Sequence, residues 1–154
     1  MSSLHAFRRA TPADANIIRD ITRAAYAKWV PLIGREPLPM TIDYGQAVID
    51  HLIDLYEDGG RVVGLIEVVP QPTHLLIENI AVHPDQQGKG IGDLLLKHAE
   101  DMARSLQLPE LQLYTNAAFT ANVAFYASRG FQETARLPFK LGGETVYMNK
   151  TLKL

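Results

Sequence analysis

The residues with the clearest chemical potential form a glycine-rich segment, Gln87-Gly88-Lys89-Gly90-Ile91-Gly92. Glycine permits positive φ angles and a close approach of the backbone, so successive N–H groups can point at one anion. A helix that begins at such a segment adds the positive end of its dipole. The pattern predicts a pyrophosphate site, and a glycine-rich turn without any ligand is the competing interpretation.

Two common nucleotide-binding motifs do not fit this segment. A Walker loop requires Ser or Thr after Gly-Lys, but Gly90 follows Lys89. A dinucleotide fingerprint of the form Gly-x-Gly-x-x-Gly requires a third glycine where the chain has Asp93. Both motifs are therefore set aside.

The glycine-rich segment is expected between a strand over residues 74–82 and a helix over residues 90–106. The strand is rich in Ile, Leu and Val. The helix carries charged residues on one side, and its other side should pack on a sheet through Ile91, Leu94, Leu95, Ala99, Met102, Ala103 and Leu106.

The rest of the chain reads as further strands and helices. An edge strand is expected over residues 4–8, a helix from residue 11 to about 28, a loop rich in proline after it, and a second helix over residues 41–52 that includes Ile42 and Ile49. Further along we expect strands on both sides of the turn at 58–60, strands over 61–69 and 111–115, a helix over 118–129, and a hairpin over 131–139 and 145–152.

The order β-α-α-β-β-β-α-β-α-β-β favours an α/β fold, with a mixed central sheet and helices on both faces. The chain has 154 residues, of which 47% are apolar, enough for one core. With no linker, repeat or low-complexity tract, we expect a single domain over residues 1–154.

Composition excludes several classes of function. The 15 basic and 17 acidic residues give a net charge of −2, which disfavours nucleic-acid and membrane partners. There is no cysteine, so thiol nucleophiles are excluded, and the five histidines lack metal-ligand spacing, so no metal is implied. Without an apolar leader or membrane span in the sequence, a soluble, cytoplasmic protein is expected.

The glycine-rich segment resembles the motif of the GNAT family of N-acetyltransferases, Arg/Gln-x-x-Gly-x-Gly/Ala, which Gln87, Gly90 and Gly92 match. It follows an Ile-Ala-Val-His-Pro strand end of the type found in the family. A second match lies over residues 122–131, where Tyr126 precedes Gly-Phe by four residues. The resemblance is strong from about residue 76 to residue 131.

The resemblance implies acetyl-CoA as cosubstrate and no metal. Its pyrophosphate would bind backbone N–H groups of Gln87, Gly88, Lys89, Gly90, Ile91 and Gly92, and its pantetheine arm would pair with Ile80, Ala81 and Val82. Asn116 and Asn122 could hold the pantetheine amides. The family often has an asparagine where this chain has Phe119, and Asn116 could instead cap the following helix.

Two catalytic roles follow from the resemblance. Tyr126 would protonate the departing CoA thiolate, and Glu78 would deprotonate the attacking ammonium. The alternatives are a buried aromatic residue at Tyr126 and a surface acid at Glu78, with Glu67 and His74 as other candidates for the base.

In this family the acceptor site is built by the first helices and the loop between them, which here span residues 26–44. This stretch contains Tyr26, Trp29, Arg35, Glu36, Asp43 and Tyr44. Glu36 and Asp43 could attract a cationic amine, and Trp29 could either line the pocket or pack on the core.

The resulting hypothesis is an N-acetyltransferase in which an amine attacks the thioester directly, with a small molecule or a peptide as acceptor. A non-catalytic acyl-CoA sensor or interaction module is the alternative, and a nucleotide-phosphate domain unrelated to CoA is a third. The sequence leaves a homodimer open.

Overall fold

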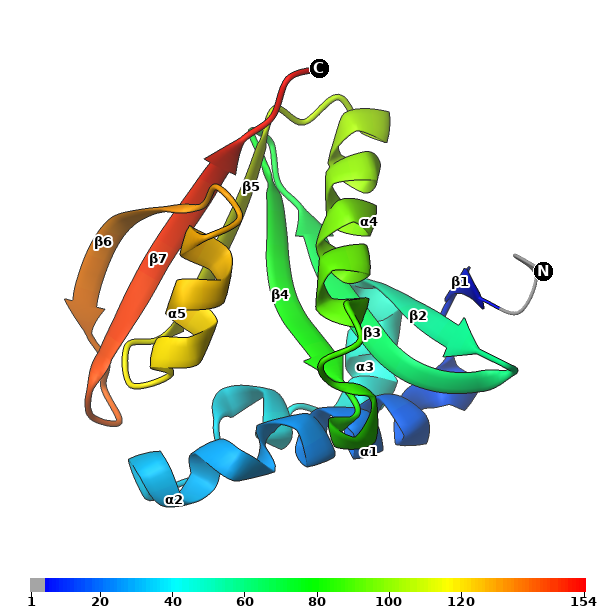
Figure 1. The fold of residues 1–154 in the computed structure, drawn as a ribbon, viewed down its shortest axis with the longest axis horizontal. Coiled ribbons are helices and arrows are strands. Elements are labelled where there is room, and N and C mark those ends of the chain that lie inside the picture. Colours follow the sequence, from blue (N-terminus) through cyan, green and yellow to red (C-terminus); the bar gives the residue numbers. More distant parts are fainter. Residues whose placement is uncertain (1–4) are drawn as a thin grey trace.

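The computed structural model describes residues 5–154, which form one seven-stranded sheet with the strand order β1-β2-β3-β4-β5-β7-β6 (Figure 1). Leu4, the expected first residue of the edge strand, lies outside the described residues. The strands are β1 (His5–Arg9), β2 (Leu52–Asp58), β3 (Arg61–Pro70), β4 (Leu75–Val82), β5 (Glu110–Asn116), β6 (Gln132–Pro138) and β7 (Glu144–Thr151).

Five α-helices accompany these strands in the described part of the chain. They are α1 (Ala15–Tyr26), α2 (Val30–Ile33), α3 (Tyr44–Asp50), α4 (Ile91–Ser105) and α5 (Thr120–Ala127), with 3₁₀ turns at Pro12–Asp14, Ala27–Trp29, Leu38–Thr41 and Pro84–Gln86. The predicted order of strands and long helices is confirmed. None of the helices in residues 5–154 is long and apolar enough to cross a membrane.

The sheet is divided at its single parallel pair of strands. β4 pairs with β5 over three residue pairs only, from Leu75–Leu111 to Ile77–Leu113, whereas β5 pairs with β7 along its whole length. Figure 1 shows β4 and β5 side by side at one end and far apart at the other. The sheet therefore opens between these strands, beyond Ile77.

A β-bulge lies where the sheet opens. In the β3–β4 register, Glu67 faces Asn79 and Val68 faces Ile77, so Glu78 is the extra residue without an opposite partner. A bulge of this kind bends its strand and redirects a side chain. The bulge therefore coincides with the divergence of β4 from β5.

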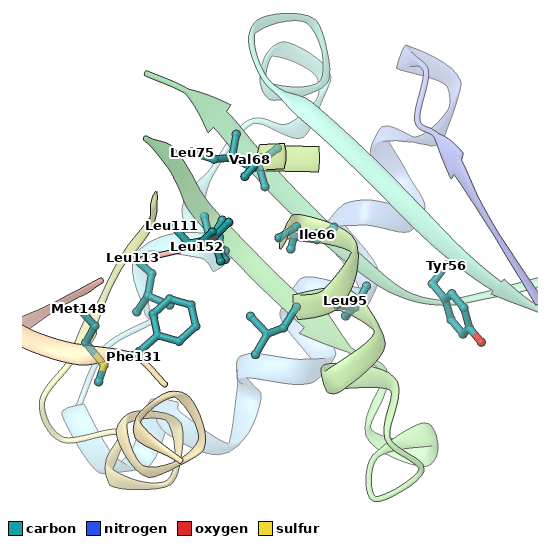
Figure 2. Close-up of a cluster of buried hydrophobic side chains, with 14 of the residues drawn as sticks. Tyr56, Ile66, Val68, Leu75, Leu95, Leu111, Leu113, Phe131, Met148 and Leu152 are labelled. Carbon is teal, nitrogen blue, oxygen red and sulfur yellow. The ribbon is translucent and has the colours of Figure 1, made fainter. Parts of the chain in front are cut away.

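Helices cover both faces of the sheet. α4 and α5 pack on one face, where a core forms around Ile66, Leu95 and Leu111 (Figure 2). α1 and α3 pack on the other face, around Ile18, Ile53 and Leu65. β3 lies between both layers, which explains its almost continuous apolar run.

The buried face of α4 is rotated relative to the prediction. Ile91, Leu95, Ala99 and Ala103 are buried as expected, but Leu96 joins them, and Leu94 and Leu106 are exposed. The prediction was wrong for Leu94 because the buried stripe follows i, i+4 steps from Ile91 and excludes it, and wrong for Leu106 because α4 ends at Ser105.

The expected loop after α1 is partly helical. Pro31 sits in the first turn of α2, where the missing N–H of proline costs nothing, and Gly34 ends the helix with a φ of 72°. A 3₁₀ turn over Leu38–Thr41 follows. α3 then spans Tyr44–Asp50, shorter than the predicted 41–52, so Ile42 lies before the helix, and both Ile42 and Ile49 are exposed.

Candidate active site

A cleft of about 430 Å³ lies beside the β4 edge, where the sheet opens. Its walls come from the end of α1, from β4, from the turn before α4, and from α5. The predicted cofactor residues that line it are Ile80, Val82, Gln87, Gly88, Gly90, Ile91, Gly92 and Asn122. Tyr126, the predicted proton donor, also lines this cleft.

The turn before α4 has the geometry of an anion nest. Gly88 and Gly90 have φ angles of 79° and 80°, and a Cβ atom at either position would meet nothing within 4 Å. Gly90 is the N-cap of α4 and offers no capping side chain to the first N–H groups of that helix. These N–H groups and the helix dipole therefore remain available for a phosphate group.

Two contacts hold the nest in position. The side chain of Gln87 donates a hydrogen bond from Nε2 to the carbonyl oxygen of Val82, at 3.2 Å, which ties the turn to β4. A Cβ at Gly92 would lie 3.1 Å from Cζ of Phe125, so the absence of a side chain at Gly92 lets α4 approach α5. Each of these motif residues therefore has a structural reason for its type.

Tyr126 projects from α5 into this cleft. Its ring packs at about right angles to Phe125 and is tilted against Phe131, with centroid distances of 5.3 and 5.5 Å. Within residues 5–154 its hydroxyl has no hydrogen-bond partner, and burial raises the pKa of Tyr126 above its ordinary value. The phenol is therefore protonated at neutral pH and free to donate a hydrogen bond to a ligand.

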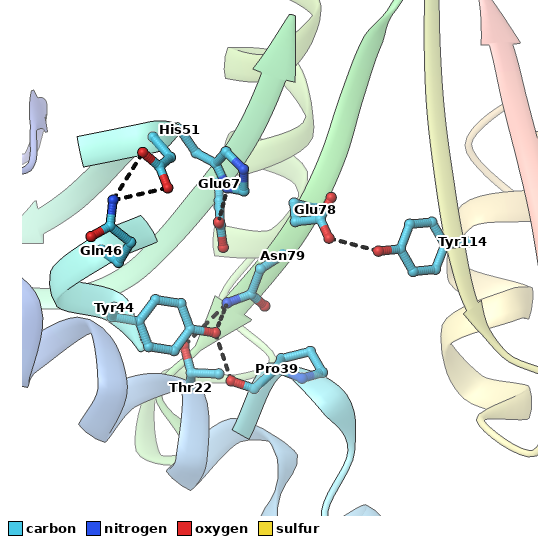
Figure 3. A network of polar contacts seen from close by, with 10 residues as sticks. Thr22, Pro39, Tyr44, Gln46, His51, Glu67, Glu78, Asn79 and Tyr114 are labelled. Atoms are coloured by element: carbon cyan, nitrogen blue, oxygen red, sulfur yellow. Dashed lines mark hydrogen bonds and ion pairs between the residues drawn. The ribbon is translucent and has the colours of Figure 1, made fainter. Parts of the chain in front are cut away.

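A second pocket of about 280 Å³ lies on the far side of Tyr26, whose side chain lines both cavities. Glu67, Glu78, His51 and Tyr114 line this second pocket (Figure 3). They come from three strands and from the end of α3. The opening of the sheet thus joins a cleft with a phosphate nest to a pocket that contains two carboxylates.

The two carboxylates have different surroundings. Glu67 is only 3% exposed and lies 2.6 Å from Nδ1 of His51. Burial raises the pKa of Glu67, although its contact with His51 works in the opposite direction. Glu78 is more accessible and accepts a 2.6 Å hydrogen bond from the hydroxyl of Tyr114, across the gap between β4 and β5 (Figure 3).

A buried amide fixes the wall between the two cavities. Asn79 is 3% exposed and donates hydrogen bonds from Nδ2 to the hydroxyl oxygens of Thr22 and Tyr44, at 3.1 and 3.3 Å. Its Oδ1 accepts a 2.9 Å hydrogen bond from the hydroxyl of Tyr26. Because this network satisfies the amide completely, it holds Tyr26 in place between the cavities.

The side chains of four other predicted site residues do not line the cleft that contains the nest. Asn116 lines the second pocket, where its Oδ1 accepts a hydrogen bond from the N–H of Ala118. Ala81 is buried against the α1 layer, and Lys89 extends along the surface to Gln86. His74 lines a separate groove on the sheet. Asn116 and His74 therefore lie away from the phosphate nest, whereas Lys89 is part of the nest segment and Ala81 is part of the β4 edge, where the predicted contacts involve only the main chain.

The loop acids are engaged away from both cavities. Glu36 forms a 2.7 Å ion pair with Arg23, and Asp43 accepts N–H groups at the start of α3. Trp29 lines the cleft that contains the nest, and its ring stacks on Phe119 at 4.5 Å. The acidic groups of the second pocket are thus supplied by strands rather than by the loop.

Sequence reasoning did not identify His51, Tyr114, Asn79 or Phe139 as pocket residues. Tyr114 and Phe139 had no motif around them, and His51 was a lone histidine between a helix and a strand. A signal existed only at Asn79, a polar residue in an otherwise apolar strand next to Glu78.

Comparison with protein families matches residues 18–131 to the acetyltransferase (GNAT) family. The chain belongs to this family. The predictions of the family and of a mixed α/β sheet with helices on both faces are therefore confirmed.

Individual GNAT relatives are distant. This chain is 42% identical to a [ribosomal protein bS18]-alanine N-acetyltransferase of Salmonella typhimurium over 55 residues, which are 36% of this chain. The chain spans little more than a third of the length of this curated relative, 37%. The match therefore carries no acceptor over to this chain.

Solved structures share the GNAT fold over almost the whole chain. The PaiA N-acetyltransferase of Thermoplasma acidophilum, in complex with coenzyme A, has a TM-score of 0.80 at 18% identity, covering 96% of this chain and 98% of that one. A GNAT family acetyltransferase of Elizabethkingia anophelis, with acetyl-CoA bound, has a TM-score of 0.75 at 20% identity. The match covers 97% of this chain and 99% of that one. At these identities the likeness shows the fold.

Proposed function

We propose that this GNAT protein transfers an acetyl group from acetyl-CoA to a primary amine by direct attack. The observation that carries the proposal is the pair of cavities on either side of Tyr26, one with a phosphate nest and the other with two carboxylates. A thioester held at their junction would be open to an amine from the second pocket. Such an arrangement supplies proximity, which is a major source of rate enhancement in group transfer.

The cleft of about 430 Å³ that contains the nest, called the cofactor-side cleft from here on, fits acetyl-CoA. Backbone N–H groups over residues 87–92 would hold the pyrophosphate, and the β4 edge over residues 80–82 would pair with the pantetheine arm. Beyond Ile77 this edge has no register partner on β5, so its peptide groups can pair with an extended ligand. Asn122, which lines the cleft, is better placed than Asn116 to contact the arm.

Transfer then requires two proton movements. Glu78 accepts a proton from the ammonium group, and the freed amine nitrogen attacks the thioester carbonyl. A C–N bond forms, the C–S bond breaks, and the CoA thiolate takes a proton from Tyr126. Tyr126 suits this role because its raised pKa keeps the phenol protonated until a thiolate appears. No covalent enzyme intermediate is needed.

A thermal-shift comparison tests the cosubstrate. Acetyl-CoA at 100 times its Kd should stabilise the protein by about 2.7 kcal/mol, which for a chain of this size is a rise in Tm of about 5–10 °C. ATP and NAD at the same concentration should give a smaller rise. A larger rise in Tm with ATP or NAD than with acetyl-CoA would contradict the proposal. Binding of acetyl-CoA without turnover on a broad amine panel would also contradict it and would indicate a non-catalytic sensor.

A further inference from the structure

We propose that the second pocket selects a primary amine carried on a compact, uncharged apolar body, such as an arylalkylamine. This proposal rests on the proposed acetyl transfer and names the acceptor class for it. The pocket combines acidic groups beside the cofactor-side junction with apolar walls further out. Its volume of about 280 Å³ suits a small molecule.

The outer walls are mainly apolar, with polar side chains at Thr115, Asn116 and Thr145. They include Leu38 and Ile42, Phe119 at the start of α5, and Phe139 next to the β6–β7 turn. Pro37 and Pro39 also line the pocket, and proline has no N–H to donate. The carbonyl of Pro39 is already occupied, since it accepts a 2.6 Å hydrogen bond from the hydroxyl of Tyr44.

The charges of the pocket are arranged for a single cation. Glu67 and Glu78 supply two carboxylates, and His51 is in contact with Glu67. Arg35 is the only lysine or arginine that lines the pocket in the described part of the chain. Its guanidinium lies over the ring of Phe139 at 5.3 Å and donates to the carbonyl of Glu36. It belongs to the apolar wall rather than to the acidic end.

This arrangement disfavours three other kinds of acceptor. The carboxylate of a free α-amino acid adjoins its amine and would lie beside Glu67 and Glu78, where like charges repel. A polyamine would place a further ammonium among the apolar walls, away from any carboxylate. The peptide groups after an N-terminal amine would also enter these mainly apolar walls, and the groups that face Pro37, Leu38 and Pro39 would lose their hydrogen bonds to water without a side-chain partner.

The test compares four acceptors, two of which differ only by a carboxylate. Transfer to phenethylamine is measured against transfer to phenylalanine, which adds only a carboxylate, and against spermidine and a peptide that begins with alanine. We expect kcat/KM for phenethylamine to exceed that for phenylalanine by about 100-fold, because the added charge is buried without a partner. Spermidine and the peptide should also be poorer acceptors than phenethylamine.

A variant pair locates the effect. Leu38→Lys places a cation in the apolar wall and should raise the KM for phenethylamine at least about tenfold, with the KM for acetyl-CoA unchanged. Leu106→Lys, at a similarly exposed leucine outside both cavities, is the control and should change neither. An unchanged amine KM in folded Leu38→Lys would contradict the proposal.

The outcomes separate this proposal from acetyl transfer itself. Preferred transfer to the peptide, to spermidine or to phenylalanine overturns the acceptor class and leaves the acetyltransferase intact. Binding of acetyl-CoA without transfer to any of the four compounds also overturns it. Absence of acetyl-CoA binding overturns both.

Discussion

At the scale of single residues, burial and hydrogen bonds give the two carboxylates of the second pocket different properties. Glu67 and Glu78 line one pocket, but Glu67 is buried and contacts His51, whereas Glu78 is more exposed and accepts a hydrogen bond from the hydroxyl of Tyr114. The more accessible Glu78, on the bulge beside the opening of the sheet, is better placed to exchange a proton with an incoming amine. Tyr126 lines the other cavity, which contains the nest.

Replacing Tyr126 tests the proton donor. Tyr126→Phe removes one hydroxyl and keeps the ring contacts with Phe125 and Phe131, so fold and acetyl-CoA affinity should be unchanged. Turnover should fall by about 10²-fold, the low end for loss of a general acid, since CoA thiolate is a tolerable leaving group. Tyr56→Phe, a buried tyrosine outside both cavities, is the control. Turnover within twofold of wild type would make Tyr126 structural.

Replacing Glu78 tests the base. Glu78→Gln should slow transfer most at the acidic end of the working range, because there the acceptor arrives as an ammonium ion and needs a group to take its proton. The measurement is the pH profile of kcat/KM for wild type and variant, with Glu110→Gln, an acid in the separate groove on the sheet, as the control. If wild type and Glu78→Gln have profiles of the same shape and height, Glu78 takes no part.

At the scale of elements, sequence patterns predicted those strands and helices that have strong periodicity, and they also located the nest. Sequence patterns did not predict features that depend on packing against the rest of the fold. Pro31 was read as a loop residue but occupies the first turn of α2, and Leu94 was placed on the buried face of α4 but is exposed. The bulge at Glu78 has no sequence mark either, since it depends on how β3 and β4 align.

An ion cluster around the buried carboxylate of Asp54 joins β1, β2 and α4. Asp54 of β2 is 6% exposed and contacts Nε of Arg9 in β1 at 2.5 Å and Nε2 of His98 in α4 at 2.7 Å. Burial alone would raise the pKa of Asp54, but hydrogen bonds from His98 and Arg9 outweigh it and hold the pKa below its ordinary value. The ionised carboxylate therefore stabilises the folded state.

Asp54→Ala should lower the free energy of unfolding by about 2–3 kcal/mol at pH 7, as expected for hydrogen bonds to a charged group. Because the folded pKa is depressed, this stabilisation is present above the unfolded value of about 4 and is lost as the pH falls further. Urea unfolding of both proteins at pH 7 and pH 3 measures the difference. Glu57→Ala, which breaks an exposed pair with Arg8, should cost less than about 1 kcal/mol. Two results would contradict this interpretation. One is that Asp54→Ala and Glu57→Ala lower the free energy of unfolding equally at pH 7, and the other is that wild type and Asp54→Ala differ as much at pH 3 as at pH 7.

At the scale of the whole molecule, the division of the sheet between β4 and β5 creates the proposed site. The nest was predictable because its residues are contiguous over 87–92. The proposed acceptor pocket was not, because His51, Glu67, Tyr114 and Phe139 are far apart in the sequence and line one pocket only in the folded chain. Glu36 and Asp43, which from the sequence could attract the amine, line neither cavity: Glu36 pairs with Arg23, and Asp43 accepts N–H groups at the start of α3.

The most direct test of the central claim is mass-spectrometric detection of acetylated amine formed from acetyl-CoA by wild type, Gly90→Asp and Gly60→Asp. Both glycines have φ near 80° and open space at the Cβ position, so both variants carry similar backbone strain, but only Gly90 lies in the nest. A carboxylate at position 90 would repel the pyrophosphate. We predict product from wild type and Gly60→Asp and at least about tenfold less from Gly90→Asp at limiting acetyl-CoA. Equal product from folded Gly90→Asp and Gly60→Asp, or none from wild type with any amine, would contradict the proposed site.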